Sequence, residues 1–191
     1  DAIADFEKHI AFEAGNFVCH RSWGIGRIAH IKDDEIVIDF VRKRGHKMSL
    51  KMAVNALNIL DKDHIWVLKV IMKKPELKKK IKEDIPWALK TIIKSHANAA
   101  DMKKIKAELV PSIFTNNEWS SWSAQARNIL KTDPDFGNLP DKVDHFAVRA
   151  NPISYEEKEF NTFKAEKNFF SRYQILEDFI NNSSPQSEYF K

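Results

Sequence analysis

Residues 19–31 read CHRSWGIGRIAHI and place a Trp-Gly-x-Gly motif inside a stretch with the alternation of a β-strand. Glycine at alternate positions lets a strand bend sharply, adopt a positive φ or approach another backbone closely. A nucleotide-binding glycine loop would need three glycines between a strand and a helix, whereas Arg27–Ile31 predicts another strand. The motif therefore indicates a barrel corner, with Trp23 plugging or covering the barrel. Whether it serves folding alone or also binding is open at this point.

Short runs with a period of two flank the motif and are separated by turn residues. Four of the five glycines lie between Gly15 and Gly45, and the candidate strands cover residues 17–20, 27–31, 35–40 and 47–50. Four or five short strands about ten residues apart are typical of a small antiparallel barrel or sheet. Leu57, Ile59 and Leu60 are the expected anchors of the closing segment. We assign residues 14–61 to this β-module.

From Lys62 the hydrophobic period changes to 3.6, which predicts an all-helical region over residues 62–180. Two capping boxes, Thr115–Glu118 and Ser154–Glu157, each predict the start of a helix. The capping box at Ser154–Glu157 would begin one long amphipathic helix that runs to Ile180. Residues 133–140 are expected to form a loop, and residues 144–149 a short extended piece. Residues 1–13 predict a short helix, and residues 181–191 a polar, frayed tail.

The composition excludes several classes of protein. The 191 residues are 43% hydrophobic and 30% charged, and no apolar run reaches the length of a membrane span. The single cysteine, Cys19, excludes an internal disulfide and a cysteine-based zinc site, which fits a reducing cytoplasm. The seven histidines form no metal-binding motif, so we expect neither a metal nor a cofactor. Because the chain begins with Asp, we interpret it as a piece of a longer protein.

No catalytic constellation is evident. Cys19 and His20 are adjacent on a predicted strand, so their side chains would point to opposite faces. Ser22 lacks the surrounding glycines of a nucleophile elbow. We therefore expect that this chain is not an enzyme.

The positive charge is concentrated in the middle of the chain. Residues 62–111 contain 13 basic and six acidic side chains, and residues 73–82 alone contain six lysines. Lys74, Lys78 and Lys82 share a helix face at i, i+4 spacing, so the segment could contact nucleic-acid phosphates without reading sequence. The alternative is an ordinary solvated face. The candidate nucleic-acid-binding residues are Lys74, Lys78, Lys79, Lys80 and Lys82.

Four segments together resemble a known module: Gly15–His20, Trp23–Ile28, Ile36–Phe40 and Gly45–Leu50. They are similar to the RNA-polymerase-interacting module of CarD-type regulators and of the transcription-repair coupling factor. With the tryptophan-containing stretch Trp119–Pro134, they also resemble the long, multidomain form of the transcript-cleavage factor GreA. The resemblance implies a Tudor-like barrel that binds a polymerase β-subunit lobe by strand pairing.

We therefore predict an α+β chain, in which a small SH3/Tudor-like antiparallel β-barrel precedes an all-α region. The expected function is that of a cytoplasmic RNA-polymerase-binding module of a bacterial Gre-type elongation factor. Non-specific nucleic-acid binding is the alternative, and a methyl-lysine cage of Phe17, Trp23 and Phe40 is a weaker one. The expected docking residues are an edge strand, a charged turn and the tryptophan: Trp23, Ile36, Val37, Ile38, Asp39, Phe40, Val41, Arg42, Lys43 and Arg44.

Overall fold

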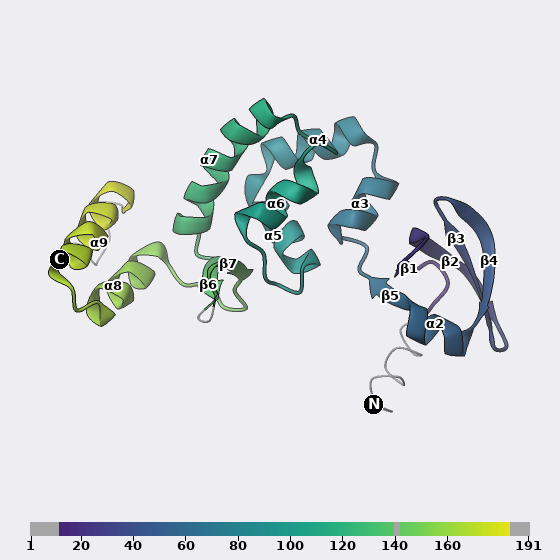
Figure 1. Cartoon of the computed structure of the whole chain (residues 1–191). Helices are drawn as coiled ribbons and strands as arrows, with labels where there is room; N and C mark the ends of the chain where they lie inside the picture. The colour runs from purple at the N-terminus through teal and green to yellow at the C-terminus, as the bar shows by residue number, and fades with distance from the viewer. Residues whose placement is uncertain (1–11, 140–141, 184–191) are drawn as a thin grey trace. The chain divides into compact units, whose positions relative to one another are not determined.

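The chain folds into two units whose boundary lies between Leu77 and Lys78 (Figure 1). The computed structural model describes residues 12–139 and 142–183. Most of the helix predicted over residues 1–13 lies outside these ranges, as does the predicted tail beyond residue 183. Each unit is described separately below.

The first unit contains a five-stranded antiparallel sheet with the strand order β4-β3-β2-β1-β5. The strands are β1 (Phe17–His20), β2 (Gly24–Lys32), β3 (Glu35–Phe40), β4 (Lys43–Ser49) and β5 (Leu57–Leu60). Successive hairpins join the first four strands, and β5 returns to pair with β1. The predicted antiparallel β-module is thus confirmed as a sheet. Closure of this sheet into a barrel stays a prediction, because β4 and β5 are the two ends of the strand order.

The core of this unit lies on one face of the sheet. Val18, Ile28, Ile36, Ile38 and Phe40 are each at most 1% exposed and belong to one hydrophobic cluster. A short helix, α2 (Leu50–Ala56), adds Ala53 and Val54 to it. The sequence analysis did not predict this helix; it starts where the Ser49 hydroxyl accepts a hydrogen bond from the Met52 N–H at 3.2 Å.

The two glycines of the Trp-Gly-x-Gly motif have different roles. Gly24 has φ +70° and begins β2 directly after the Arg21–Trp23 turn, since His20 pairs with Gly24. A Cβ on Gly26 would lie 2.6 Å from Cδ1 of Phe40 and 2.7 Å from Cγ2 of Ile38. The chain therefore turns before β2, and Gly26 allows β2 to pack against the core side chains of β3.

The boundary between the units differs from the one predicted at residue 61. Helix α3 (Ile65–Ile71) contacts β2, and its residues Ile65 and Val67 are buried. The helix thus belongs with the sheet. The boundary falls inside the next helix, α4 (Lys74–Glu83).

The second unit has a helical core made by α4, α5 (Ile85–Ser95), α6 (Met102–Leu109) and α7 (Asn116–Thr132). Asp84 and Asp101 cap α5 and α6, and, as predicted, Thr115 and Glu118 form a complete capping box at α7. The Trp122 indole N–H donates to the Ile81 carbonyl at 3.0 Å, which ties α7 to α4.

The region predicted as all helical also contains a β-hairpin, which corrects that expectation. Strands β6 (Phe136–Leu139) and β7 (Lys142–Val148) pair, although the sequence suggested a loop and a short extended piece. Tertiary contacts support the hairpin. The N–H groups of Phe146 and Ala100 each donate to the other residue's carbonyl, at 2.8 and 3.1 Å.

The long amphipathic helix predicted after Ser154 is two helices, α8 (Tyr155–Ala165) and α9 (Phe169–Asn182). The break comes from side chains that cap a new helix. The Glu166 carboxylate accepts hydrogen bonds from the Lys167 and Asn168 N–H groups at 2.7 Å, and the Asn168 side chain accepts one from Ser171 N–H at 3.1 Å. These local bonds compete with helix continuation.

The two glycines can be distinguished by alanine substitution. We expect Gly26→Ala to lower the free energy of unfolding by about 1–3 kcal/mol, because the added methyl group overpacks the core. Gly24→Ala has open space around its Cβ but keeps the positive φ, so it should cost roughly 1 kcal/mol. Urea denaturation of both variants measures the difference. Equal destabilisation would contradict the close-packing role of Gly26.

Candidate interaction surfaces

Strand β3, which we expected at the sheet edge, is a central strand. It pairs with β2 on one side and with β4 on the other, so its backbone cannot pair with a partner. Ile36, Val37, Ile38 and Phe40 are all buried. The edge assignment was therefore wrong, because β3 has a hydrogen-bonded neighbour on each side, and sequence alone does not show which strands flank it.

The two edge strands of the described sheet are β4, which pairs only with β3, and β5, which pairs only with β1; of these, β4 lies next to the charged segment predicted for docking. The Leu50 N–H donates to the Asp34 carbonyl at 2.9 Å. Since bonded and non-bonded pairs alternate along an antiparallel ladder, the Lys47 and Ser49 N–H groups face away from β3. A cross-strand ion pair of 3.0 Å between Lys47 and Glu35 holds the strand. β4 can thus accept a further strand.

An aromatic cluster joins the β1–β2 turn to this edge. The half-buried Trp23 ring stacks on His20 at 4.1 Å between ring centroids and lies 4.0 Å from His46 on β4 and 5.4 Å from Phe40. The Lys43 ammonium lies 5.0 Å above the same indole. The sequence analysis missed His20 and His46 as members of the cluster, because nothing in their spacing marks a contact across strands.

The cluster does not form the methyl-lysine cage considered above. Phe40 is only 1% exposed, and two imidazoles contact the Trp23 ring, so the rings pack on one another instead of surrounding an open space. The pKa of His46 is lowered, first by burial and then by the charges of Lys43 and His20. Its imidazole is therefore neutral near pH 7.

The charged segment Val41–Arg44, which forms the turn after β3 and the first two residues of β4, is exposed. Val41 is 69% exposed, and Arg42, Lys43 and Arg44 are also exposed. Asp39 is bonded within the turn, where its carboxylate accepts the Gly45 N–H at 2.7 Å. Beside the turn lies a surface hollow of about 450 Å³, lined by Phe17, Ile25, Gly26, Arg27, Asp39, Phe40, Val41, Arg44 and Val70.

The candidate lysines of α4 are largely engaged within the protein. Lys78 and Lys82 lie 2.8 and 2.7 Å from the Glu118 carboxylate on α7. The Lys80 ammonium lies 4.1 Å from the centre of the Trp87 ring. The i, i+4 stripe predicted from the sequence is therefore partly an internal contact and not an open cationic face.

The described residues contain no group of three or more potential metal ligands. None of the described helices is long and apolar enough to cross a membrane.

Comparison with known proteins relates this chain to GreA-associated proteins. Residues 66–153 match the GRAD helix-turn-helix domain family, and residues 155–191 match the GreA-associated C-terminal domain family. A Treponema pallidum protein named for GreA-associated domains is 50% identical over 191 residues, all of this chain. A Borreliella burgdorferi protein named transcription elongation factor GreA is 43% identical over 181 residues, 95% of the chain.

The chain spans 29% and 20% of the lengths of these two relatives. No solved structure matches it. The comparisons thus support a GreA-related protein, whereas the resemblance of the sheet to CarD-type modules stays a prediction.

The Glu118 cluster makes stability depend on pH. Hydrogen bonds from Lys78, from Lys82 and from the Thr115 N–H hold the pKa of Glu118 well below its ordinary value. A lowered folded-state pKa contributes stability above the unfolded pKa of about 4.3, and this contribution is lost as the pH falls below it. Wild type should therefore resist urea better than Glu118→Gln near about pH 6, and the difference should shrink towards about pH 3.

Glu83→Gln is the matched control, because Glu83 forms a longer, exposed pair with Lys79 at 3.8 Å. Exposed pairs contribute little, so its urea midpoint should stay close to that of the wild type. A Glu118→Gln effect that is constant across this pH range would contradict the ionic origin of the contact.

Proposed function

We propose that this chain is an RNA-polymerase-docking module of a bacterial, cytoplasmic transcription elongation factor related to GreA. In this proposal the module acts by protein–protein contact and not by catalysis. The observation that carries it is the combination of GreA-named relatives with an edge strand, β4, which is paired on one side only in the first unit's sheet. The resemblance to CarD-type modules suggests a lobe of the polymerase β subunit as the partner.

The β4 edge suits strand pairing for two reasons. Its outward N–H groups can bond to the backbone of a partner strand, which supplies affinity that does not depend on side chains. The neighbouring Trp23 and the exposed basic turn Arg42–Arg44 provide an anchor and a charge pattern, which set orientation and association rate. The proposed docking surface is therefore centred on β4 and not on β3, and it still includes Trp23 and the basic residues Arg42–Arg44.

The substitution Lys47→Pro tests whether β4 pairs with a strand of the partner. Proline removes the outward Lys47 N–H but leaves the bonds from β4 to β3, so the sheet should fold while pairing with a partner strand is blocked. We expect at least about a tenfold loss of binding to purified RNA polymerase, measured by biolayer interferometry.

Lys47→Ala is the matched control, because it removes the ion pair with Glu35 but keeps the N–H. It should bind polymerase nearly as well as the wild type, since exposed ion pairs are weak. Circular dichroism checks that both variants fold. Full polymerase binding by a folded Lys47→Pro variant would refute docking through β4.

A second candidate function is non-specific nucleic-acid binding, which the helix-turn-helix description of the family matching residues 66–153 favours. Of the lysines predicted for this role, Lys74 and Lys79 are exposed, whereas Lys78 and Lys82 face Glu118. Lys74 and Lys79 are therefore the better candidates for phosphate contacts.

Salt titration of binding to duplex DNA tests this role. The slope of log affinity against log salt should fall by roughly 0.9 for each phosphate-contacting lysine that is replaced. Under this second function, Lys74→Gln and Lys79→Gln together should reduce the slope and leave polymerase binding unchanged. An unchanged slope would show that these two lysines do not contact DNA phosphates.

A further inference from the structure

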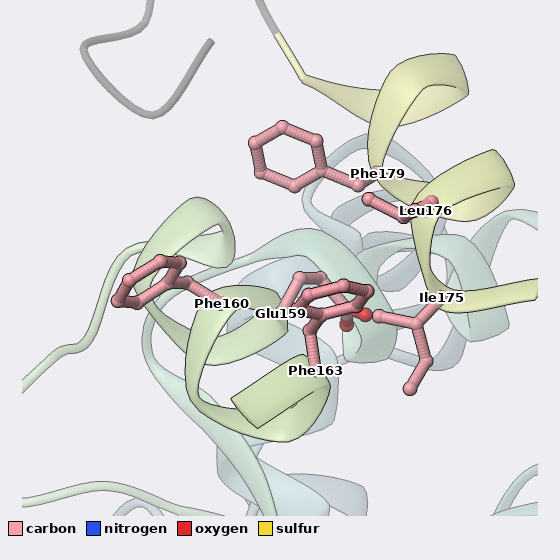
Figure 2. Close-up of a pocket in the computed structure, with 6 residues that line it drawn as sticks. All are labelled: Glu159, Phe160, Phe163, Ile175, Leu176 and Phe179. Atoms are coloured by element: carbon pink, nitrogen blue, oxygen red, sulfur yellow. The ribbon is translucent and has the colours of Figure 1, made fainter. Parts of the chain in front are cut away.

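Helices α8 and α9 enclose an apolar pocket that neither proposed function uses. It has a volume of about 220 Å³ and is lined by Glu159, Phe160, Phe163, Ile175, Leu176 and Phe179 (Figure 2). Five of these six side chains are apolar. The exception, Glu159, is the feature that gives the pocket a chemical preference.

Glu159 is a carboxylate without a local partner. The residue is only 8% exposed, and none of the described residues forms a hydrogen bond or an ion pair with its side chain. Figure 2 shows Glu159 among the apolar residues that line the pocket. Burial raises the pKa of Glu159, although the nearby charges of Lys158 and Lys131 oppose the shift. A carboxylate in such a place gains from a further hydrogen-bond donor or cation that reaches it directly.

Contacts among three helices hold the walls of the pocket in place. The Tyr155 hydroxyl donates to the Asp178 carbonyl at 3.0 Å and joins α8 to α9. The Asp178 carboxylate forms a 2.7 Å ion pair with Lys131 on α7. The burial of Glu159 therefore follows from a defined arrangement of three helices.

An exposed apolar stripe on α9 continues from the pocket. Phe169, Tyr173, Leu176 and Ile180 recur at intervals of four, three and four residues, and each is at least 43% exposed. This spacing places them on one face of the helix, which is the pattern by which a helix packs against another amphipathic segment. Leu176 belongs to both the stripe and the pocket, so the two form one surface.

The charge of the surroundings favours a cationic partner. Residues 155–183 contain six acidic and four basic side chains. The aromatic faces of α8 already attract cations: the Arg172 guanidinium lies 4.1 Å from the centre of the Phe163 ring, and Lys164 lies 4.5 Å from that of Phe160. Neither forms an ion pair with Glu159, and the nearby charges of Lys158 and Lys131 act on it without a direct contact, so its carboxylate can still accept a donor from an incoming group.

We propose that the α8–α9 surface binds an amphipathic helical segment of another protein, which inserts one lysine or arginine side chain into the pocket. The apolar stem of that side chain would pack among Phe160, Phe163 and Phe179, and its charged end would meet Glu159. The remaining apolar face of the segment would cover Leu176 and the stripe of α9.

A thermodynamic cycle on the whole chain tests the proposal. The probes are 15-residue helical peptides of alanine, leucine and glutamine, with either lysine or norleucine at the centre of the leucine face. A third peptide has the composition of the lysine peptide but carries its lysine on the opposite face. We expect the first peptide to bind at least about tenfold more tightly than the other two, measured by fluorescence anisotropy.

Glu159→Gln should bring the ratio between the lysine and norleucine peptides close to one, because the amide keeps the shape of the side chain and removes its charge. Glu157→Gln, an exposed position on the same helix, should preserve the ratio. Leu176→Ser should weaken both peptides by a similar factor. Equal binding of the two peptides to the wild type, or an unchanged ratio in Glu159→Gln, would overturn the proposal.

Two other occupants of the surface give distinct results. Self-association in sedimentation velocity that Leu176→Ser abolishes would show that a second copy of the chain covers the surface. Binding to vesicles of phosphatidylcholine and phosphatidylglycerol that the same variant abolishes would show a lipid surface instead. Either result would overturn the assignment of a basic protein segment.

Discussion

The first unit depends on the close approach of Gly26 to Phe40 and Ile38. Because Gly26 has no side chain, β2 lies directly against the core residues of β3. The turn before β2 is therefore held beside the same core. That turn carries Trp23, whose ring contacts His46 on the edge strand. Gly26 therefore allows the core to pack and also positions the aromatic cluster beside the proposed docking edge, so a folding role of the motif is compatible with the proposed binding role.

In the second unit, a single carboxylate has two structural roles. Glu118 takes part in the capping box that starts α7 and also neutralises two lysines of α4. Lysines that form a cationic stripe along the sequence thus hold two helices together. This is why the positive charge of a segment is weak evidence for nucleic-acid binding until the positions of the neighbouring carboxylates are known.

The two units present surfaces of different physical character. Strand β4 offers backbone donors that any extended partner can use, with a basic turn beside them. The α8–α9 surface offers an apolar face with the carboxylate of Glu159 among its residues, which is the basis for the proposed basic amphipathic partner.

The sequence by itself determined the elements with strong local signals. Alternating strands, the capping residues Asp84, Asp101 and Thr115, and the change of period near residue 62 depend on neighbours along the chain, and the structure contains each of them. Only the tertiary structure decided which strand is the edge, that α3 belongs with the sheet, that β6 and β7 pair, and that Lys78 and Lys82 face Glu118. The cluster of Trp23 with His20 and His46, and the burial of Glu159, also belong to this second group. The physical reason is that each of these features depends on contacts between residues far apart in the chain, or between neighbouring strands, and no local period records such contacts.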